Sequence, residues 1–332
     1  MKKLRWGMLG AANIGDRDVI PALLASETAE LLGIASRDLG KARAKADRYG
    51  VPRAYGSYEE LLADPDIEAV YIPLPNHLHK PWTIAAAQAG KHVLCEKPLA
   101  LTAEEAREMA DACRAAGVHL AEAFMYRHHP RIARVKEILA SGEIGPVRAI
   151  QAAFSYNGAG SKGDIRHVAE WGGGGLYDVG CYPLSAARWI MGTEPEAVTV
   201  RALFSPEHGG VDMMASGLVE FPDGVAMSFD CGMWAADRNR LEIVGSEGRI
   251  VLEPAFLPGL ENDGLTVEVR GSVRKEGPYG VNAYVVQADR FARVVRGLEP
   301  PAYPAEDAVA GMRLLEACLA SAKRGERIRL GT

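Results

Sequence analysis

The first 123 residues alternate short, continuously apolar segments with stretches of helical character, and this alternation restricts the fold more than any other feature. Strand-length apolar segments lie at residues 4–9, 29–35, 69–72, 92–95 and 119–122. Helices are expected between them, for example over 83–89 and 103–116. Strands that are apolar on both faces and separated by helices are typical of a parallel sheet covered on both sides. Right-handed crossovers between such strands predict a doubly wound α/β domain.

Beyond residue 124 the apolar residues change to a period of two, as in "VRAIQAAFSY" and "VAMSFDCGM". This alternation, bounded by Gly, Pro and Asp, is typical of antiparallel strands. Helices are expected at 130–139, 176–191, 283–296 and 305–324. We therefore predict two domains: an α/β domain with a parallel sheet over residues 1–123, and an α+β domain with a large, mainly antiparallel sheet over residues 124–332.

Composition argues against several classes of function. The net charge is −5 with no long basic run, which does not suit a nucleic-acid platform. No apolar run approaches the length of a membrane span. The five cysteines are odd in number, widely spaced and without a C-x-x-C pair. A reduced, cytoplasmic protein without a structural metal is the simplest interpretation.

A glycine turn, "GMLGAANIG", follows the first strand directly and opens a helix. From Gly10 it has the pattern G-x-A-x-x-G, with Ala12 where the dinucleotide fingerprint usually has its second glycine. Gly10 permits a tight turn, and Ala12 is small enough for a pyrophosphate to approach. Asn13 and Ile14 then begin a helix whose N-terminal N–H groups can bind phosphates. Glycine turns after strands can be purely structural, but the position in the first βα unit favours a Rossmann dinucleotide site.

The end of the second strand, "AELLGIASRD", bears on the choice of cofactor. An acid at this end would bind both ribose hydroxyls and repel a 2′-phosphate. The chain instead has Ser36 and Arg37, with Lys41 a turn further on. A hydroxyl, a guanidinium and an ammonium form a cradle for a 2′-phosphate, so NADP(H) is favoured over NAD(H). The alternative is that Asp38 caps the next helix and the cations are simply solvated.

The fourth strand ends in "YIPLPNHLHK", whose prolines predict an extended turn. Two histidines in this turn could suggest a metal, but no further ligands lie at compatible spacing, and no metal is expected. A hydrogen-bonding loop along the cofactor is favoured instead. Its candidate contacts are Pro73, Leu74, Asn76 and His79.

The fifth strand ends in "CEKP", with Glu96 and Lys97 at its tip. Pro98 disfavours a helical conformation at Lys97, so the lysine is held extended beyond the sheet edge. The Lys97–Pro98 bond can also be cis, as in many sharp turns. A lysine beside a nicotinamide can hydrogen-bond a substrate oxygen or lower the pKa of a neighbour. The alternative is an ordinary solvated loop lysine.

In the second domain, "EWGGGGLYDVGCYPL" places four glycines before a helix, where backbone can approach a ligand closely. Asp178 and Tyr182 are four residues apart and share a helical face. A tyrosine, with a pKa of ~10, needs a nearby cation to exchange protons at neutral pH, and Lys97 could be that cation. Taken singly, Asp178 could merely complement the helix dipole and Tyr182 could be a core residue.

Five segments together resemble one family over almost the whole chain. They are the glycine turn, "EKP", "GGGGLYDVGCY", "EAFMYRHHP" and the closing "EDAVAGMRLLEACLASAKRG". This is the glucose–fructose oxidoreductase / inositol dehydrogenase / MocA family of NAD(P)-dependent oxidoreductases. Many members carry histidine at the position of Tyr182. Tyrosine there is similar to the branch that holds glucose–fructose oxidoreductase, xylose dehydrogenase, dihydrodiol dehydrogenase and some ketosugar reductases.

The resemblance implies that Lys97, Asp178 and Tyr182 are catalytic. It also implies a dinucleotide-binding first domain and a second domain that binds substrate and forms oligomers. Further candidates by resemblance are Glu96 and Arg127 on the cofactor side, and Arg166, Trp171 and Tyr284 on the substrate side.

The expected function is hydride transfer between nicotinamide C4 and a carbinol or carbonyl carbon of a sugar or related cyclic polyol. Tyr182 would exchange the hydroxyl proton, assisted by Lys97. A cofactor-sensing regulator without turnover is the alternative, although a sensor has no need of the catalytic set. A glycosidase that uses transient oxidation would carry a different second-domain motif. Apolar strands such as "VAMSFDCGMW" further predict a homodimer or homotetramer through the C-terminal sheet.

Overall fold

The computed structural model describes residues 1–161 and 163–331, and the chain divides into two compact units. The first unit comprises Met1–His128 and Asn282–Val309, and the second comprises residues 129–281 and those from 310 onward. The sequence prediction divided the chain once, after residue 123. The structure instead places 282–309 with the first unit, because the helix that begins this segment packs on the N-terminal elements.

The first unit contains a six-stranded parallel sheet, which confirms the predicted doubly wound fold. The strands are β1 (Leu4–Leu9), β2 (Ala29–Ala35), β3 (Arg53–Tyr55), β4 (Ala69–Ile72), β5 (His92–Cys95) and β6 (Leu120–Glu122). Their order is β3-β2-β1-β4-β5-β6, so the direction of winding changes between β1 and β4. Ligands of such sheets bind beyond the carboxyl ends of the strands at this switch point. Only β3, a three-residue strand that is half-buried throughout, was missed by the sequence pattern.

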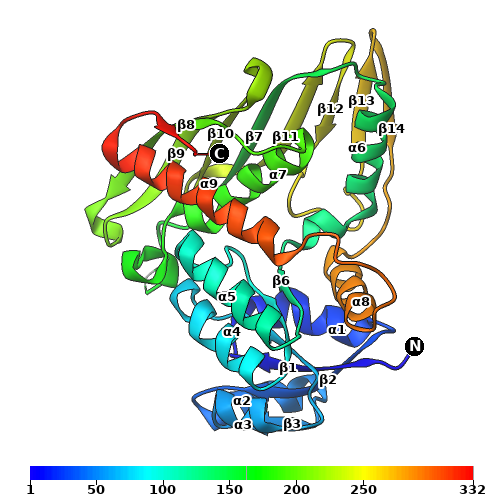
Figure 1. Ribbon diagram of the computed structural model, residues 1–332, viewed down its shortest axis with the longest axis vertical. Coiled ribbons are helices and arrows are strands. Elements are labelled where there is room, and N and C mark those ends of the chain that lie inside the picture. Colours follow the sequence, from blue (N-terminus) through cyan, green and yellow to red (C-terminus); the bar gives the residue numbers. More distant parts are fainter. Residues whose placement is uncertain (162, 332) are drawn as a thin grey trace. The chain divides into compact units, whose positions relative to one another are not determined.

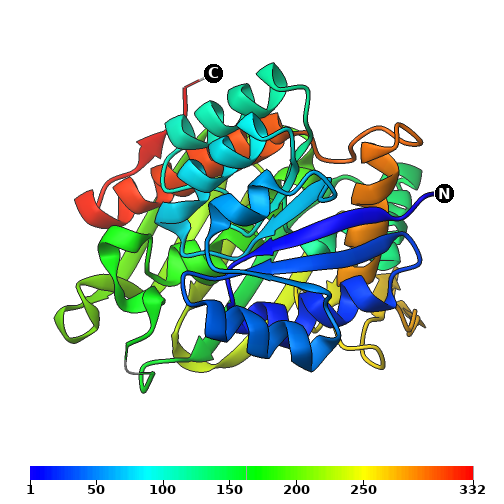
Figure 2. The same ribbon diagram turned by 90° about the horizontal axis from the view of Figure 1, so that it is seen from below.

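Helices cover both faces of this sheet. They are α1 (Ile20–Ala25), α2 (Leu39–Tyr49), α3 (Tyr58–Ala63), α4 (His79–Gln88), α5 (Ala103–Ala115) and α8 (Ala283–Val295). A π-helical turn, Gly15–Val19, precedes α1. Figure 2 shows α8, in orange, beside the blue α1, and the two helices are in contact. Trp6 of β1 meets Phe291 of α8 at 5.1 Å between ring centroids, so α8 completes the core of the first unit.

The second unit contains a nine-stranded, mainly antiparallel sheet, as predicted. Its order is β14-β13-β12-β11-β7-β10-β9-β8-β15, and within the described residues only β7 and β10 pair in parallel. The bounds are β7 (Val147–Asn157), β8 (Ala197–Ser205), β9 (Val211–Glu220), β10 (Ala226–Gly232), β11 (Trp234–Gly245), β12 (Gly248–Leu252), β13 (Leu265–Val269), β14 (Ser272–Glu276) and β15 (Ile328–Arg329). The sequence patterns did not include β14 and β15.

Three helices accompany this sheet: α6 (Pro130–Ser141), α7 (Cys181–Met191) and α9 (Ala305–Arg324). Figure 1 shows α7 and α9 across one face of the sheet. The Ser321 hydroxyl of α9 accepts a hydrogen bond from the backbone N–H of Val200 at 2.8 Å. The helix predicted over 176–191 begins instead as a π-helical turn, Leu176–Gly180, and continues as α7.

The apolar residues of β10 point inward. Met227, Phe229 and Cys231 are buried, whereas Ser228 is exposed and Asp230 half-buried. The outer face of this strand is therefore polar, and the reason given above for self-association does not hold for β10. Exposed apolar side chains of the sheet lie on β8 and β9 instead, where Leu203 is 62% and Leu218 39% exposed. No helix within the described residues is long and apolar enough to cross a membrane.

Candidate active site

The turn after β1 has the backbone geometry of a phosphate cradle. Gly10 has φ +116°, and a Cβ built on it would lie 2.9 Å from Leu74 Cδ2. A Cβ on Gly15 would lie 2.2 Å from Met8 Cε, so this glycine allows the following helix to pack on β1. Ala12 is half-exposed and Asn13 exposed. The turn thus fits a dinucleotide pyrophosphate, which needs small residues and accessible N–H groups.

Lys45 of α2 supports this turn and was missed by the sequence analysis. The side chain is only 9% exposed, and its Nζ lies 2.7 Å from Asp16 Oδ1 and 3.3 Å from the carbonyl oxygen of Ala12. Helical spacing places Lys45 on the buried face of α2 with Ala42 and Ala46. That spacing was the available signal, because a lysine on an apolar helical face needs a partner.

The end of β2 presents two cations to solvent. Arg37 and Lys41 are exposed, and within the described chain neither is paired with a carboxylate. Burial raises the pKa of Tyr58, and the neighbouring Arg37 partly opposes that shift. Ser36 is buried and accepts a hydrogen bond from the N–H of Asp38, while Asp38 caps α2 through the N–H of Lys41. Asp38 thus caps α2, as the alternative interpretation of the sequence expected, and Arg37 and Lys41 are at the same time exposed at the end of β2.

His79, predicted to contact the cofactor, is fully buried at the start of α4. Its Nε2 lies 2.8 Å from the carbonyl oxygen of Leu74, and its Nδ1 lies 3.1 Å from that of Pro98. Burial lowers the pKa of His79 to about 4, so the ring is neutral at pH 7 and donates a hydrogen bond to only one of these two oxygens while packing against the other. The histidine therefore links the loop after β4 to the loop after β5, and any effect on a cofactor is transmitted through these loops. Pro73 is buried and Asn76 half-buried in the first of them.

The loop after β5 is held from several sides. The Lys97–Pro98 bond is cis. Tyr71 of β4 donates a hydrogen bond to Glu96 Oε1 at 2.6 Å, and the N–H of Lys97 contacts Glu96 Oε2 at 3.2 Å. Burial raises the pKa of Glu96, and the charge of Lys97 opposes that shift. Lys97 itself is half-buried at the carboxyl end of β5, where the sheet topology places a ligand site.

Arg127 and Tyr284 both lie within the first unit. Arg127 is 6% exposed, forms an ion pair with Asp307 at 2.5 Å and lies over the rings of Phe124 and Tyr303 at 4.7 and 4.8 Å. These contacts give Arg127 a structural role beside its expected place near the cofactor. Tyr284 stands in the first turn of α8 and interacts with Arg17.

In the second unit, Asp178 is the centre of a polar cluster. Its two carboxylate oxygens contact Tyr156 Oη at 2.7 Å and Arg166 Nε at 2.9 Å. Burial, together with the charge of Asp178, raises the pKa of Tyr156, and the same carboxylate raises the pKa of Arg166. The predicted substrate residue Arg166 is thus tied to a predicted catalytic residue. Tyr156, in β7, carried no sequence signal.

The four-glycine segment approaches protein groups closely. A Cβ on Gly173 would lie 2.4 Å from the carbonyl oxygen of Arg166, and one on Gly174 would lie 2.1 Å from Asp212 Oδ1. Asp212 is 2% exposed and accepts a hydrogen bond from the N–H of Leu176 at 2.7 Å. Burial raises the pKa of Asp212 to about 7. The sequence analysis expected a ligand at these glycines, whereas the close neighbours in the structure are Arg166 and Asp212.

Tyr182 lies one helical turn beyond Asp178, in the first turn of α7. It is 5% exposed and packs between Phe154 and Phe256, with ring centroids 5.1 and 5.7 Å away. Trp171 is 41% exposed in the loop before the glycines. The candidate residues therefore form two groups, one around Lys97 in the first unit and one around Asp178 and Tyr182 in the second.

A parallel sheet with a glycine turn after its first strand and a charged loop at a neighbouring strand end defines the class of Rossmann-fold oxidoreductases. Comparison with known proteins agrees. Residues 4–124 match the oxidoreductase family with an NAD-binding Rossmann fold, and residues 132–251 match the GFO/IDH/MocA C-terminal domain. The chain belongs to this GFO/IDH/MocA family of oxidoreductases, as the sequence resemblance predicted.

Three similar proteins match nearly the whole chain. An uncharacterised oxidoreductase of Rhizobium meliloti is 42% identical over 98% of both chains. A D-xylose 1-dehydrogenase (NADP+) of Haloferax volcanii is 41% identical over 98% of this chain and 100% of its own. The solved structure of a 3-ketoreductase from Actinomadura kijaniata, in complex with NADP and TDP-benzene, has a TM-score of 0.90 at 32% identity and covers 96% of this chain and 98% of its own.

Proposed function

We propose that the protein is an NADP(H)-preferring sugar dehydrogenase or reductase in which Tyr182 is the general acid/base and Lys97 assists it. The observation that carries this proposal is the position of Lys97, held in a braced loop at the carboxyl end of β5, next to β4 and the switch point of the sheet. A lysine in such a place can contact the oxygen of a substrate whose carbon exchanges a hydride.

The bound dinucleotide would supply or accept the hydride at its nicotinamide ring. The residues of the chain have the other tasks. The ammonium of Lys97 donates a hydrogen bond to the substrate oxygen and stabilises negative charge on it. The hydroxyl of Tyr182 gives or takes the proton of that oxygen, and Lys97 favours the ionised tyrosine. Asp178, clamped by Tyr156 and Arg166, positions the helical turn from which Tyr182 projects.

The D-xylose dehydrogenase, whose name specifies NADP+, supports a sugar as substrate and NADP as cofactor, and the 3-ketoreductase solved with NADP supports the same cofactor. In this chain Arg37 and Lys41 would bind the 2′-phosphate, because both are exposed and no acid stands at the end of β2. The preferred sugar and direction would follow from a substrate screen with both cofactors.

We also propose self-association through the second-unit sheet, where Leu203 and Leu218 are exposed. Light scattering should then give the mass of a dimer or tetramer, and a monomer mass would contradict this. The five cysteines are all buried and free, which suits the expected reducing, cytoplasmic compartment.

The test of the catalytic assignment is Tyr182→Phe. Turnover with NADPH and ketosugars, or with NADP+ and aldoses, should fall by roughly 10²–10⁴-fold, because the proton route is lost. The dissociation constant for NADPH, measured by fluorescence titration, should change little. Tyr279→Phe, which changes a tyrosine beside His129, is the matched control and should keep full activity.

Persistence of turnover in Tyr182→Phe at saturating substrate would contradict the role of the tyrosine. NADPH binding without turnover of any sugar by the unmodified protein would instead favour the cofactor-sensing regulator.

A further inference from the structure

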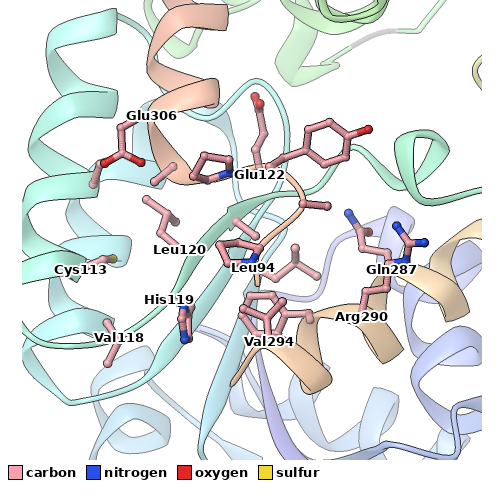
Figure 3. Close-up of a pocket in the computed structure, with 18 of the residues that line it drawn as sticks. Leu94, Cys113, Val118, His119, Leu120, Glu122, Gln287, Arg290, Val294 and Glu306 are labelled. Carbon is pink, nitrogen blue, oxygen red and sulfur yellow. The ribbon is translucent and has the colours of Figure 1, made fainter. Parts of the chain in front are cut away.

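A cavity of about 220 Å³ lies in the first unit, and none of its lining residues belongs to the glycine turn or to the loop that carries Lys97. Its walls are the edge strand β6, the helices α5 and α8, and the segment 299–306. Figure 3 shows Gln287, Arg290 and Val294 of α8 on one side, Cys113, Val118 and His119 on the other, and Leu94 and Leu120 between them. Most of this lining is apolar, with Phe291 and four proline or alanine residues of the closing segment adding to it.

Two hydrogen-bond donors in the wall have no protein acceptor. Gln287 is 4% exposed, and its Nε2 is buried without a hydrogen-bond partner. Arg290 follows three residues later, on the same face of α8. The Arg290 side chain is half-buried and forms no ion pair within residues 1–161 and 163–331. An amide donor buried without an acceptor is rare in native proteins and indicates a missing partner.

The acids around the cavity are already engaged. Glu299 pairs with Arg293 at 3.0 Å, Glu306 with Arg114 at 2.5 Å, and Glu122 accepts a hydrogen bond from the N–H of Leu99 at 2.9 Å. Gln287 Nε2 and Arg290 therefore remain as hydrogen-bond donors of the lining, and Arg290 is positively charged. An acceptor with negative charge and an apolar body is the complementary ligand.

We propose that this cavity binds a small aromatic or branched aliphatic monocarboxylate. The carboxylate accepts hydrogen bonds from the amide of Gln287 and the guanidinium of Arg290, and the apolar body lies against Leu94, Leu120 and Val294. The volume of the cavity is large enough for such a ligand. An apolar cavity of about 150 Å³ holds benzene, and this larger cavity therefore has room for a ring that bears a carboxylate. The site is separate from the residues assigned to catalysis and does not depend on the proposed reaction.

Calorimetric titration of the full chain with benzoate, phenylacetate and 3-methylbutanoate tests this, in the presence of saturating NADP+ so that the nucleotide site is filled. At least one acid should bind with a dissociation constant at or below about 1 mM. Its methyl ester should bind at least about tenfold more weakly, because the ester has lost the charge that Arg290 recognises.

Gln287→Leu and Arg290→Met should each weaken the acid by about tenfold or more, whereas Arg43→Met, on the exposed side of α2, should not. Thermal melting and NADPH binding of the variants verify that they are folded. Absence of binding by all three acids up to about 10 mM would overturn the proposal. It would equally be overturned if ester and acid bound alike, or if both cavity variants kept the affinity.

Discussion

At the carboxyl edge of the first sheet, some residues could contact a ligand, and others hold the loops of that edge in place. His79 has the sequence context of a ligand contact, yet it is buried and joins two loops through their carbonyl oxygens. Lys45 similarly fixes the carbonyl of Ala12 within the glycine turn. Exposed side chains at the same edge, such as Arg37, which has no carboxylate partner among the described residues, are the ones available to a cofactor.

Arg37→Ala should therefore change cofactor preference. KM for NADPH is expected to rise by roughly 10- to 100-fold, because a charge-assisted hydrogen bond to the 2′-phosphate is lost. KM for NADH should stay within about twofold, since NADH lacks that phosphate. Steady-state kinetics with both cofactors provide the comparison, and Arg43→Ala, on the exposed face of the following helix α2, is the matched control. An equal rise for both cofactors would show that Arg37 does not discriminate between them.

At the scale of elements, the turn before α7 depends on a buried carboxyl group. Asp212 of β9 accepts a hydrogen bond from Leu176, the first residue of the π-helical turn that carries Asp178. The glycines before this turn leave the space that the carboxyl occupies. A strand of the sheet thus positions the helix that bears the candidate catalytic residues.

Asp212→Asn should alter the pH dependence of stability. The folded-state pKa, about 7, lies above the ordinary value of 3.8, so the folded protein binds a proton more tightly than the unfolded chain. The contribution of Asp212 to the free energy of unfolding is fully present below about pH 4, and it is lost as the pH rises through about 7. Asn keeps an acceptor for Leu176 and has no charge to bury.

The melting temperature of the natural protein should consequently fall between pH 5 and pH 8 by several degrees more than that of Asp212→Asn, as followed by circular dichroism. Parallel pH profiles of the two proteins would contradict a buried ionisation at Asp212.

At the scale of the whole molecule, each compact unit is assembled from segments distant in sequence. In the first unit, Glu68 receives hydrogen bonds from Arg296, just beyond α8, at 2.9 Å and from Arg5 of β1 at 3.2 Å. The hydrogen bond from Arg296 is the main cause that lowers the pKa of Glu68 to about 2. This cluster fastens the returning segment to the first sheet.

Glu68→Gln should lower the free energy of unfolding by on the order of 1–3 kcal/mol at pH 7, because two arginines lose a charged acceptor. The pKa of Glu68 is depressed on folding, so its contribution is present above pH 4.5 and is lost as pH falls towards 2. Urea unfolding at pH 7 and pH 3 measures this difference. An undiminished difference at low pH would show that the charge of Glu68 is not its origin.

The sequence by itself determined the two sheet types, because continuous and alternating apolar runs report burial on two faces or on one. It also indicated which candidate residues of the first unit follow strand ends, since Ser36, Asn76 and Lys97 each lie within a few residues of the end of β2, β4 or β5. Edge strands escaped it: β3, β14 and β15 lie at the ends of the two sheets and contain no fully buried residue, so they show no apolar pattern.

Only the tertiary structure decided which side chains are engaged and by what. The pairing of Asp178 with Tyr156 and Arg166 joins residues that are 22 and 12 positions away from it. Long-range packing likewise decides that residues 282–309 belong to the first unit. It also decides that the amide of Gln287 is buried in the cavity wall without an acceptor. Local periodicity reports whether a residue is buried, but a partner is selected by the geometry of elements that meet only after the chain has folded.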